Sequence, residues 1–290
     1  MNFLDLLHNK KIVVLDGAMG TQLDKKGLMS RGGNNLDAPE AVREIHRRYA
    51  QCGCDILTTN TLTMNRIYIE THNVGVPVAD VNRAGAALAR EAAGNDRCVL
   101  GNMSSTGQLL EPYGSYTEAG FVEAFREQAQ VLAEAGVDAF LIESMFDLRE
   151  AMCALQACKE VAPLPALVSV AFQTPKDGGR TMMGHTADAF ARHLTAGGAD
   201  AIGANCGDLD GGQMAEVVAH LRAATELPIA AQPNAGKPRL VDDKTVFDME
   251  PGPFAEGIAQ CIEAGARIVG GCCGTTPAHI EAVRQVIPSM

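Results

Sequence analysis

Eight short apolar runs alternate with longer Ala- and Glu-rich stretches along this chain, and this alternation limits its possible folds more than any other feature. The runs lie at residues 11–15, 55–59, 98–101, 138–142, 166–170, 200–203, 228–231 and 267–269. The helical stretches that follow them lie at residues 39–52, 79–93, 117–135, 148–161, 187–196, 213–225, 254–264 and 277–286. Parallel strands need a crossover of a dozen or more residues between them, and each of these stretches is long enough to supply one.

The connections into several runs also resemble one another. The segments CGCDIL, AGVDAF and GGADAI each place a small residue and a glycine just before the run and an aspartate at its start, which indicates one helix-to-strand connection used repeatedly. Eight such units close into a (β/α)₈ TIM barrel, with the active site at the C-terminal ends of the strands. We therefore predict an α/β fold with one barrel domain over residues 1–290. A doubly wound open sheet is the alternative, but LDGAMGT is not the Gly-rich turn expected after its first strand.

Composition excludes several classes of function. The chain has 24 basic and 35 acidic residues, a net charge of −11, and only 4% aromatic residues with no Trp. Such a chain has neither a surface that neutralises phosphates nor a platform for stacking bases. No apolar run is long enough to span a membrane, and the first residues lack the pattern of a signal peptide. We expect a cytoplasmic protein that binds neither nucleic acid nor membrane.

Three of the nine cysteines differ from the rest in their surroundings. An odd number in a chain without a secretion signal argues against a disulfide framework, and most of these thiols are predicted to fill the core. Cys206, Cys272 and Cys273 instead follow apolar runs among Gly and Asn residues, where strand ends face the mouth of a barrel. Three thiolates can bind zinc and leave one coordination position open. A buried thiol pair or a vicinal disulfide at Cys272–Cys273 is the alternative interpretation.

An open position on such a zinc ion suits a second sulfur better than water. Three thiolates leave the site with a net charge of −1, which makes the ion a poor generator of hydroxide. A substrate thiol has a pKa of about 8.5, and coordination would deprotonate it while keeping it nucleophilic. The sequence therefore predicts thiol activation, with a methyl or another small alkyl group as the electrophile.

Several motifs together resemble one known family. The segments LDGAMGTQL, EIHRRYAQCGCDILTTNT, LIESMFDLREA, GANCG, QPNAGKP and VGGCCGTTPAHI are similar to the homocysteine-binding zinc domain of the homocysteine S-methyltransferases. The likeness is strongest to the first module of cobalamin-dependent methionine synthases, and it covers nearly the whole chain. It implies a barrel, a zinc ion on Cys206, Cys272 and Cys273, and the methylation of homocysteine to methionine.

The resemblance also implies where homocysteine binds. Its amino-acid part would lie between DGAMGT and IES, and the substrate-binding residues are then Asp16, Gly17, Ala18, Glu143, Ser144 and Asn205. Glu143, with Asp16 nearby, could pair with the ammonium group, because a carboxylate that follows AFLI is costly to bury unpaired. Backbone N–H groups around Gly17, Ala18 and Ser144 could receive the carboxylate.

The family also implies that Asn234 can occupy the fourth zinc position before substrate arrives. From the residues alone, Asp16 and Asn234 can equally be turn residues, since each stands close to a glycine. Thr58 and Asn60 are further candidates for lining the pocket.

The methyl donor is the least constrained part of the prediction. The chain departs from methionine synthases at GNMSSTG, TNTL and GDLDGG, all at the predicted mouth, where they bear on the acceptor thiol rather than on the barrel. With one barrel, and no second barrel for a folate or module for cobalamin, we expect an external donor. Methylcobalamin on a separate corrinoid protein comes first. S-methylmethionine or S-adenosylmethionine comes second, and betaine third, because a quaternary ammonium favours an aromatic cage.

Two other classes of function fit parts of the sequence. A thiol–disulfide catalyst would use Cys272 and Cys273 with no metal requirement. A non-catalytic protein would bind zinc or dock a corrinoid protein without turnover. Metal content distinguishes the first class from a methyltransferase, and product formation distinguishes the second.

Overall fold

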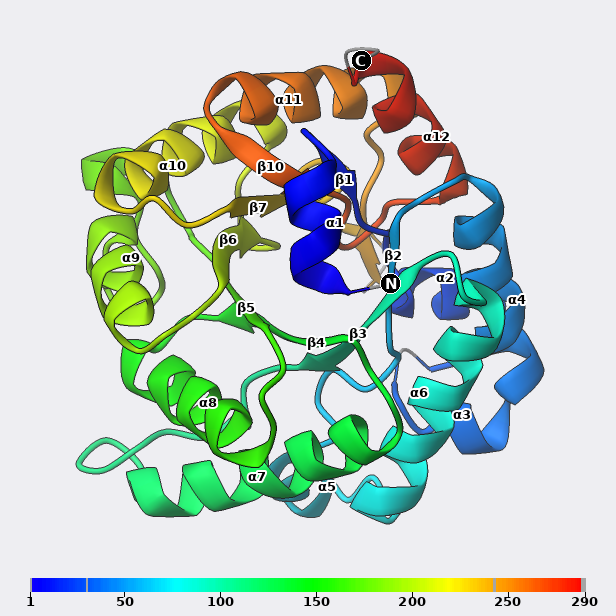
Figure 1. Ribbon diagram of the computed structural model, residues 1–290, viewed down its shortest axis with the longest axis vertical. Coiled ribbons are helices and arrows are strands. Elements are labelled where there is room, and N and C mark those ends of the chain that lie inside the picture. Colours follow the sequence, from blue (N-terminus) through cyan, green and yellow to red (C-terminus); the bar gives the residue numbers. More distant parts are fainter. Residues whose placement is uncertain (1, 30, 242–243, 288–290) are drawn as a thin grey trace.

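The computed structural model describes residues 2–29, 31–241 and 244–287, and a closed barrel of eight parallel strands lies at its centre (Figure 1). The barrel strands are β1 (Val13–Val14), β2 (Ile56–Thr58), β3 (Cys98–Met103), β4 (Ala139–Met145), β5 (Ala166–Val170), β6 (Ala201–Asn205), β7 (Ile229–Gln232) and β10 (Ala266–Val269). Their order is β1-β10-β7-β6-β5-β4-β3-β2, and a parallel bridge between Leu15 and Ile56 joins the two ends of the sheet. The predicted α/β barrel is confirmed, and each predicted run overlaps one strand.

Eight helices surround the barrel at the predicted positions, to within a few residues at each end. They are α4 (Pro39–Gln51), α6 (Val78–Ala93), α7 (Glu118–Glu134), α8 (Leu148–Val161), α9 (Ala187–Ala196), α10 (Gly211–Ala224), α11 (Pro251–Glu263) and α12 (Pro277–Val286). Several shorter elements were not predicted from the sequence. These are α1 (Phe3–Asn9), α2 (Gly20–Asp24), α3 (Asn34–Asp37), α5 (Arg66–Thr71), η1 (Lys176–Gly178) and the strand pair β8 (Arg239–Val241) and β9 (Lys244–Val246).

The helix ends carry the local signals expected of them. The Thr117 side chain accepts a hydrogen bond from the Gly120 backbone N–H at the start of α7, at 3.1 Å. Asp210 and Gln213 form a capping box at the start of α10. Gly136 follows α7 with a φ of 81°, in the left-handed region that glycine adopts without strain. These local signals explain why the helix boundaries could be predicted from the sequence.

Side chains inside the barrel form one apolar cluster, which helix α1 closes at the amino-terminal ends of the strands. Phe3, Leu6 and Leu7 of α1 are buried, and they belong to the same cluster as inward-facing residues such as Leu15 and Leu141. Figure 1 shows α1 lying across this end of the barrel. With this end closed, the opposite end is the one where polar side chains at the strand ends can meet a ligand.

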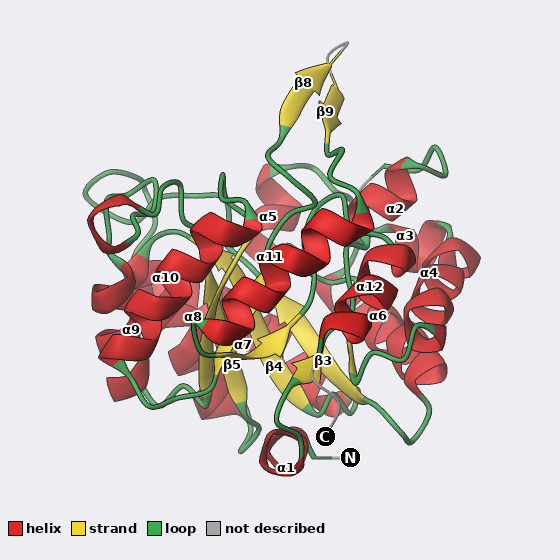
Figure 2. Ribbon diagram, turned by 90° about the horizontal axis from the view of Figure 1, so that it is seen from above, coloured by secondary structure: helices red, strands yellow, loops and turns green. Residues whose placement is uncertain are grey.

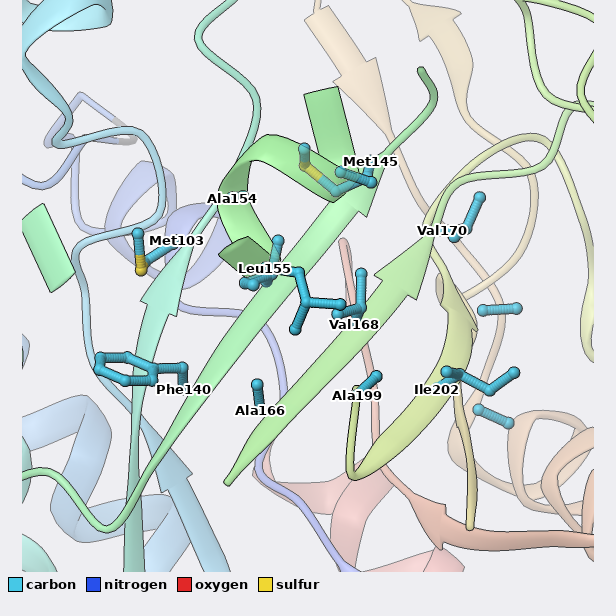
Figure 3. Packing of buried hydrophobic residues seen from close by; sticks show 14 of the residues in the cluster. Met103, Phe140, Met145, Ala154, Leu155, Ala166, Val168, Val170, Ala199 and Ile202 are labelled. Atoms are coloured by element: carbon cyan, nitrogen blue, oxygen red, sulfur yellow. The ribbon is translucent and has the colours of Figure 1, made fainter. Parts of the chain in front are cut away.

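A second, larger apolar layer fills the space between the sheet and the surrounding helices. Figure 3 shows part of this layer, where Phe140 of β4, Val168 of β5 and Ile202 of β6 belong to the same cluster as Leu155 of α8. Each of these four side chains is at most 1% exposed. The strands are therefore covered on both faces, as expected for a parallel sheet.

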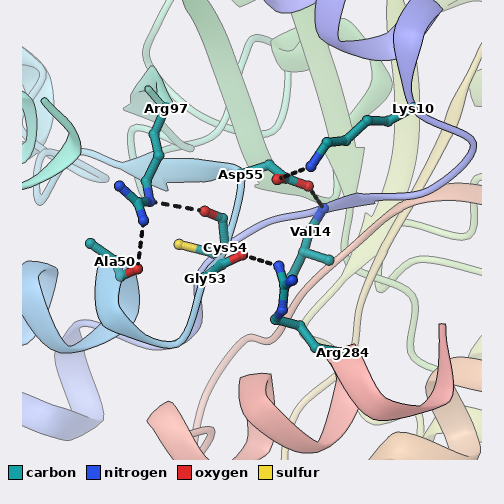
Figure 4. A network of polar contacts seen from close by, with 8 residues as sticks. All are labelled: Lys10, Val14, Ala50, Gly53, Cys54, Asp55, Arg97 and Arg284. Atoms are coloured by element: carbon teal, nitrogen blue, oxygen red, sulfur yellow. Dashed lines mark hydrogen bonds and ion pairs between the residues drawn. The ribbon is translucent and has the colours of Figure 1, made fainter. Parts of the chain in front are cut away.

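The repeated aspartates before the strands hold the amino-terminal end of the barrel together. Asp55 accepts a hydrogen bond from the Val14 backbone N–H at 3.0 Å, and its other carboxylate oxygen lies 2.5 Å from Lys10 Nζ. Figure 4 shows this network, in which Arg97 also donates to the Cys54 carbonyl oxygen at 3.1 Å. The same construction recurs at Asp138 and Asp200, and it gives the predicted repeated connection a physical basis.

The strand pair β8–β9 lies at the other end of the molecule from α1 (Figure 2). It belongs to the long segment between β7 and α11, and its two strands pair antiparallel, with Arg239 opposite Val246. Leu240 and Val241 are exposed there, at 75% and 46%. The segment therefore presents apolar side chains at the same end of the barrel as the carboxyl ends of its strands.

None of the helices in the described ranges is both long enough and apolar enough to cross a membrane.

Candidate active site

The three cysteines singled out in the sequence meet at the carboxyl end of the barrel. Cys206 directly follows β6, whereas Cys272 and Cys273 lie in the loop after β10. Their Sγ atoms all lie within 4.8 Å of one another. In a tetrahedral zinc site with Zn–S bonds of about 2.3 Å, sulfur atoms are about 3.8 Å apart. The thiols are thus arranged nearly as a zinc ion would require.

Strand β7 lies between β6 and β10, and its carboxyl end aligns the two cysteine segments. The Cys206 N–H donates to the Gln232 carbonyl oxygen at 3.1 Å, and the Cys272 N–H donates to the Pro233 carbonyl oxygen at 2.9 Å. Cys206 itself has a φ of 54°, a left-handed conformation that is uncommon outside glycine. Strain of this kind is typical of functional sites, where the surrounding structure holds a side chain in place.

The turn after the adjacent cysteines depends on Gly274. This residue has a φ of 83°, and a Cβ atom added to it would lie 2.2 Å from Cβ of Phe247. Only glycine fits both conditions, and the sharp turn lets Cys272 and Cys273 approach Cys206 from one loop.

The thiols of the cluster differ electrostatically from the other cysteines, although none of the nine takes part in a disulfide. Burial raises the pKa of the Cys153 and Cys261 thiols to about 12. The pKa of Cys206 is instead lowered, because the thiols of Cys272 and Cys273 donate hydrogen bonds to its sulfur. Their own pKa values are raised by that interaction. Hydrogen bonding within the cluster therefore favours ionisation of Cys206 over ionisation of Cys272 and Cys273.

The donor set fits a soft cation such as zinc. Besides the three sulfur atoms, Asn234 offers an amide within hydrogen-bonding reach of Cys206. Its Nδ2 donates to the Gly207 carbonyl oxygen at 2.9 Å, whereas its Oδ1 is buried without a hydrogen-bond partner among the described residues. A buried carbonyl oxygen without a partner is costly. Three sulfur donors leave the fourth position of a tetrahedral zinc site open.

A cavity of about 170 Å³ opens beside Cys272 and Cys273. It includes most of the substrate-binding residues predicted from the sequence, although Ser144 and Asn205 do not line it. The lining residues are Asp16, Gly17, Ala18, Met19, Gly20, Thr21, Arg31, Gly32, Thr58, Thr59, Asn60, Leu62, Thr63, Asn102, Glu143, Gln232, Gly271, Cys272 and Cys273.

Two carboxylates in this cavity are buried without a counter-ion among the described residues. Asp16 is 3% exposed and accepts hydrogen bonds from the Thr58 backbone N–H at 2.9 Å and the Thr58 hydroxyl at 3.0 Å. Glu143 is 9% exposed and accepts a hydrogen bond from Asn102 Nδ2 at 2.7 Å. Burial raises the pKa of Asp16 to about 8 and that of Glu143 to about 7. A bound cation would relieve this cost.

Asn205 connects the substrate side of the site to the thiols. Its Oδ1 accepts a hydrogen bond from the Ser144 N–H at 2.9 Å, and its Nδ2 donates to Ser144 Oγ at 2.8 Å. The same Nδ2 lies 3.4 Å from a carboxylate oxygen of Glu143 and 3.8 Å from Cys272 Sγ. Ser144 has a φ of 59°, so the chain bends sharply where β4 passes this amide. Asn205 therefore orders the neighbours of the cavity rather than lining it.

Two further residues that the sequence analysis missed hold the loop after β1. The Ala18 N–H donates to Thr275 Oγ1 at 2.9 Å, and the Tyr49 hydroxyl donates to the Ala18 carbonyl oxygen at 2.8 Å. A Cβ atom on Gly17 would lie 2.7 Å from Thr275 Oγ1, so a larger residue would not fit there. Thr275 stands close to the paired cysteines in GCCGTTP and could have been noticed, whereas nothing in the sequence marks Tyr49.

Residues 13–287 match the family model described as homocysteine S-methyltransferase. The chain is 32% identical over 309 residues to methionine synthase of Mycobacterium leprae, an alignment covering 98% of this chain and 25% of that protein. It is 31% identical over 312 residues to methionine synthase of Mycobacterium tuberculosis, and this alignment covers 100% of this chain and 26% of that protein. The chain thus spans about a quarter of the length of these curated relatives.

Solved structures show the same fold. The metallated form of the homocysteine methyltransferase MmuM from Escherichia coli superposes with a TM-score of 0.80 at 22% identity, covering 97% of this chain and 98% of that one. The carboxyl transferase domain of Rhizobium etli pyruvate carboxylase gives a TM-score of 0.53 at 16% identity, covering 97% of this chain and 47% of that one. At these identities the likeness concerns the barrel alone.

Proposed function

The chain belongs to the homocysteine S-methyltransferase family, and we propose that it methylates the sulfur of homocysteine to give methionine at a zinc site formed by Cys206, Cys272 and Cys273. One observation carries this proposal. Three thiols lie within 4.8 Å of one another beside a cavity that contains two buried carboxylates with no counter-ion in the described part of the chain. A substrate with a thiol at one end and an ammonium group at the other matches both features.

Each part of the site has a role in this reaction. When bound, zinc would lower the pKa of the substrate thiol and present it as a nucleophilic thiolate. Cys206, Cys272 and Cys273 would hold the ion, with Asn234 Oδ1 as a fourth donor in the absence of substrate. Asp16 and Glu143 would bind the substrate ammonium, because their burial makes a counter-ion strongly favourable.

In the transfer step itself, the main role of the protein is to position the reactants. The substrate thiol gives up its proton, its sulfur forms a bond to the methyl carbon, and the bond between that carbon and the donor breaks. The electron pair of the broken bond leaves with the donor. Because attack at carbon requires the sulfur, carbon and leaving group in line, the donor must approach from the open mouth of the barrel. The carboxylates and the thiols at this cavity would orient the substrate for that approach.

For the donor, we propose a methylated corrinoid carried by a separate protein, and S-methylmethionine or S-adenosylmethionine as the alternative. Exposed apolar side chains support a protein partner. Among the described residues, all large apolar side chains that are at least 36% exposed, except Leu4, lie between a barrel strand and the main helix that follows it. They are Met29, Leu36, Leu62, Leu109, Tyr113, Met182, Met183, Leu240 and Val241. Exposed apolar surface gathered at one end of a molecule is typical of an interaction site.

Zinc content and homocysteine binding test the proposal first. We expect about one zinc per chain, and calorimetry should show homocysteine binding that a chelator abolishes. Methionine is a useful control ligand, because it shares the amino-acid part but has no thiol proton. Homocysteine should therefore release more protons than methionine at neutral pH. A metal-free protein, or equal proton release by both ligands, would contradict thiol activation.

Variants of single cysteines sharpen this test. Cys206→Ser should lose zinc and homocysteine binding together while the fold is retained. Cys153→Ala is the matched control, because Cys153 is a buried thiol of α8 outside the cluster and its loss should leave zinc content unchanged. Full zinc content in Cys206→Ser would show that the three-thiolate assignment is wrong.

The donor is identified by product formation. Zinc-loaded protein and homocysteine are incubated with a methylated corrinoid protein, with free methylcobalamin, with S-methylmethionine or with S-adenosylmethionine, and methionine is measured. We expect fastest turnover with the protein-bound corrinoid. Faster turnover with either sulfonium compound would favour the alternative donor.

A further inference from the structure

Leu62 is the residue at which the cavity meets the exposed apolar surface at the mouth of the barrel. It lines the cavity together with Cys272 and Cys273, and it is 36% exposed. Among the large apolar side chains of the described residues that are at least 36% exposed, no other lines this cavity. A molecule that covers the apolar surface and reaches into the cavity would therefore meet Leu62.

Leu62 lies in a tight turn between two buried residues. The Met64 N–H donates to the Thr61 carbonyl oxygen at 3.0 Å and closes a turn over residues 61–64. Thr61 and Met64 are 0% and 1% exposed, so both ends of the turn lie inside the protein. Turns favour Gly, Pro, Asn, Asp and Ser, and the local backbone therefore does not require a leucine at this position.

Hydrogen bonds from buried side chains fix both ends of the turn. Gln128 Nε2 of α7 donates to the Thr61 carbonyl oxygen at 2.8 Å, and Asn82 Nδ2 of α6 donates to the Met64 carbonyl oxygen at 2.9 Å. The Thr61 hydroxyl donates to the Asn102 carbonyl oxygen of β3 at 2.7 Å. The three residues that supply these donors are 0% exposed. The turn is therefore held in place at the rim before any ligand binds.

The cavity is too small to enclose a large methyl donor as well as an amino acid. Its volume is about 170 Å³, whereas pockets that enclose a drug-sized ligand measure about 300 Å³ or more. Homocysteine is smaller than such ligands, but a corrinoid is far larger. A corrinoid donor must therefore lie at the rim, with only its methyl group directed into the cavity.

We propose that Leu62 contacts the corrinoid that carries the methyl group and excludes water from the space between this group and the homocysteine sulfur. This inference rests on the proposed function, because it assumes methyl transfer to homocysteine bound in the cavity. Water bound to the sulfur would stabilise the thiolate and slow its attack on carbon, and an apolar side chain offers such water no hydrogen-bond partner. Leu62 is thus a donor-contact residue that binds neither zinc nor the charged groups of homocysteine.

The test measures methyl transfer and homocysteine affinity separately on zinc-loaded protein, with free methylcobalamin and with a methylated corrinoid protein as donors. Leu62→Ala removes the apolar contact, so kcat/KM for both donors should fall by about tenfold. Zinc content and the homocysteine dissociation constant from calorimetry should stay within about twofold of the wild-type values. Leu62→Met, which nearly conserves the side-chain volume, should restore most of the rate.

Leu4→Ala is the matched control, because Leu4 is a leucine of α1 that is 44% exposed at the closed end of the barrel. This variant should transfer methyl groups at the wild-type rate.

Wild-type kcat/KM in Leu62→Ala would overturn the proposal, and so would a variant that loses homocysteine affinity as strongly as it loses rate. A loss of rate with S-methylmethionine but not with either corrinoid donor would also overturn it, because Leu62 would then face a sulfonium donor. If the zinc-loaded wild-type protein formed no methionine with any of these donors, the proposed function itself would fail, and this inference with it.

Discussion

Carboxylates at the two ends of the barrel have opposite surroundings. At the amino-terminal end, Asp138 accepts a hydrogen bond from the Val99 N–H at 2.7 Å and lies 2.5 Å from Arg90 Nη2. Asp200 likewise accepts a hydrogen bond from the Ala166 N–H at 2.8 Å and lies 2.6 Å from Lys159 Nζ. At the other end, Asp16 and Glu143 are buried with hydrogen bonds but without a cation among the described partners.

This difference separates stability from ligand binding. Asp55, Asp138 and Asp200 each connect a strand to its neighbour in the sheet and to a basic residue, so their charges are balanced within the fold. The pKa values of Asp16 and Glu143 are raised to about 8 and about 7 by burial, which means that the folded protein bears a cost for ionising them. The mouth therefore contains groups whose charges only a ligand would balance, as expected where a site is built at the expense of stability.

The largest effect is expected from pH acting on Asp16. Its folded-state pKa of about 8 lies above the ordinary value of 3.8, so between these values the folded protein holds a proton that the unfolded chain has lost. Stability of the metal-free protein should therefore fall as pH rises through this window, by an amount on the order of 5 kcal/mol. Asp16→Asn should remove most of this fall. Denaturant unfolding at pH 5 and pH 8.5 measures it, and equal pH dependence in both proteins would contradict the assignment.

The next effect concerns Glu143 and the ligand. Glu143→Gln should weaken homocysteine binding by about 100-fold, because the ammonium group loses a charged partner in a buried site. The same change should not lower the free energy of unfolding, since it replaces a buried carboxyl group with a neutral amide. Calorimetry and urea unfolding of one preparation measure both quantities. A variant that is strongly destabilised yet still binds homocysteine would place Glu143 with the stabilising aspartates instead.

At the amino-terminal end of the barrel, we expect a substitution to reduce stability and to leave ligand binding unchanged. Asp138→Ala should lower the free energy of unfolding by about 2 kcal/mol, because it leaves the Val99 N–H without its acceptor. Asp138→Asn, which keeps an acceptor oxygen, should lose less. Homocysteine affinity of the folded protein should be unchanged in both variants. Weaker homocysteine binding in Asp138→Ala would mean that the two ends are not independent.

The smallest effect is expected from removing an ion pair. Each of these aspartates makes an ion pair and accepts a hydrogen bond from a strand N–H, and one variant can separate the two contacts. Lys159→Met removes the ion pair with Asp200 but keeps the hydrogen bond from the Ala166 N–H. Since the Lys159 and Asp200 side chains are 32% and 28% exposed, we expect a loss of only about 0.5 kcal/mol. A loss as large as that of Asp138→Ala would show that the ion pair, and not the hydrogen bond to the strand, carries the stability.

Much of this architecture could be predicted from the sequence because its signals are local. Strands and helices of this kind are marked by the spacing of apolar residues and by capping residues such as Thr117 and Asp210, which act within a few positions. Repetition of the same unit then favours a closed barrel. The three cysteines could be identified because each follows an apolar run, and the carboxyl ends of parallel strands meet at one end of a barrel.

Other features depended on contacts between distant parts of the chain. The hydrogen bond between Ala18 and Thr275 joins residues 257 positions apart, and no local sequence pattern predicts it. Helix α1, the strand pair β8–β9 and the approach of Arg31 to the cavity were missed for the same reason.

The sequence by itself determined the order of strands and helices, the placement of the thiols and the end of the barrel at which each acid lies. Asp16 follows an apolar run and Asp55 begins one, so their opposite positions can be read from the chain. Only the tertiary structure decided that Asp55 has Lys10 as its partner while Asp16 has no cation among the described residues. The physical reason is that charge compensation depends on which side chains closure of the barrel brings within a few ångströms, and sequence separation does not specify that.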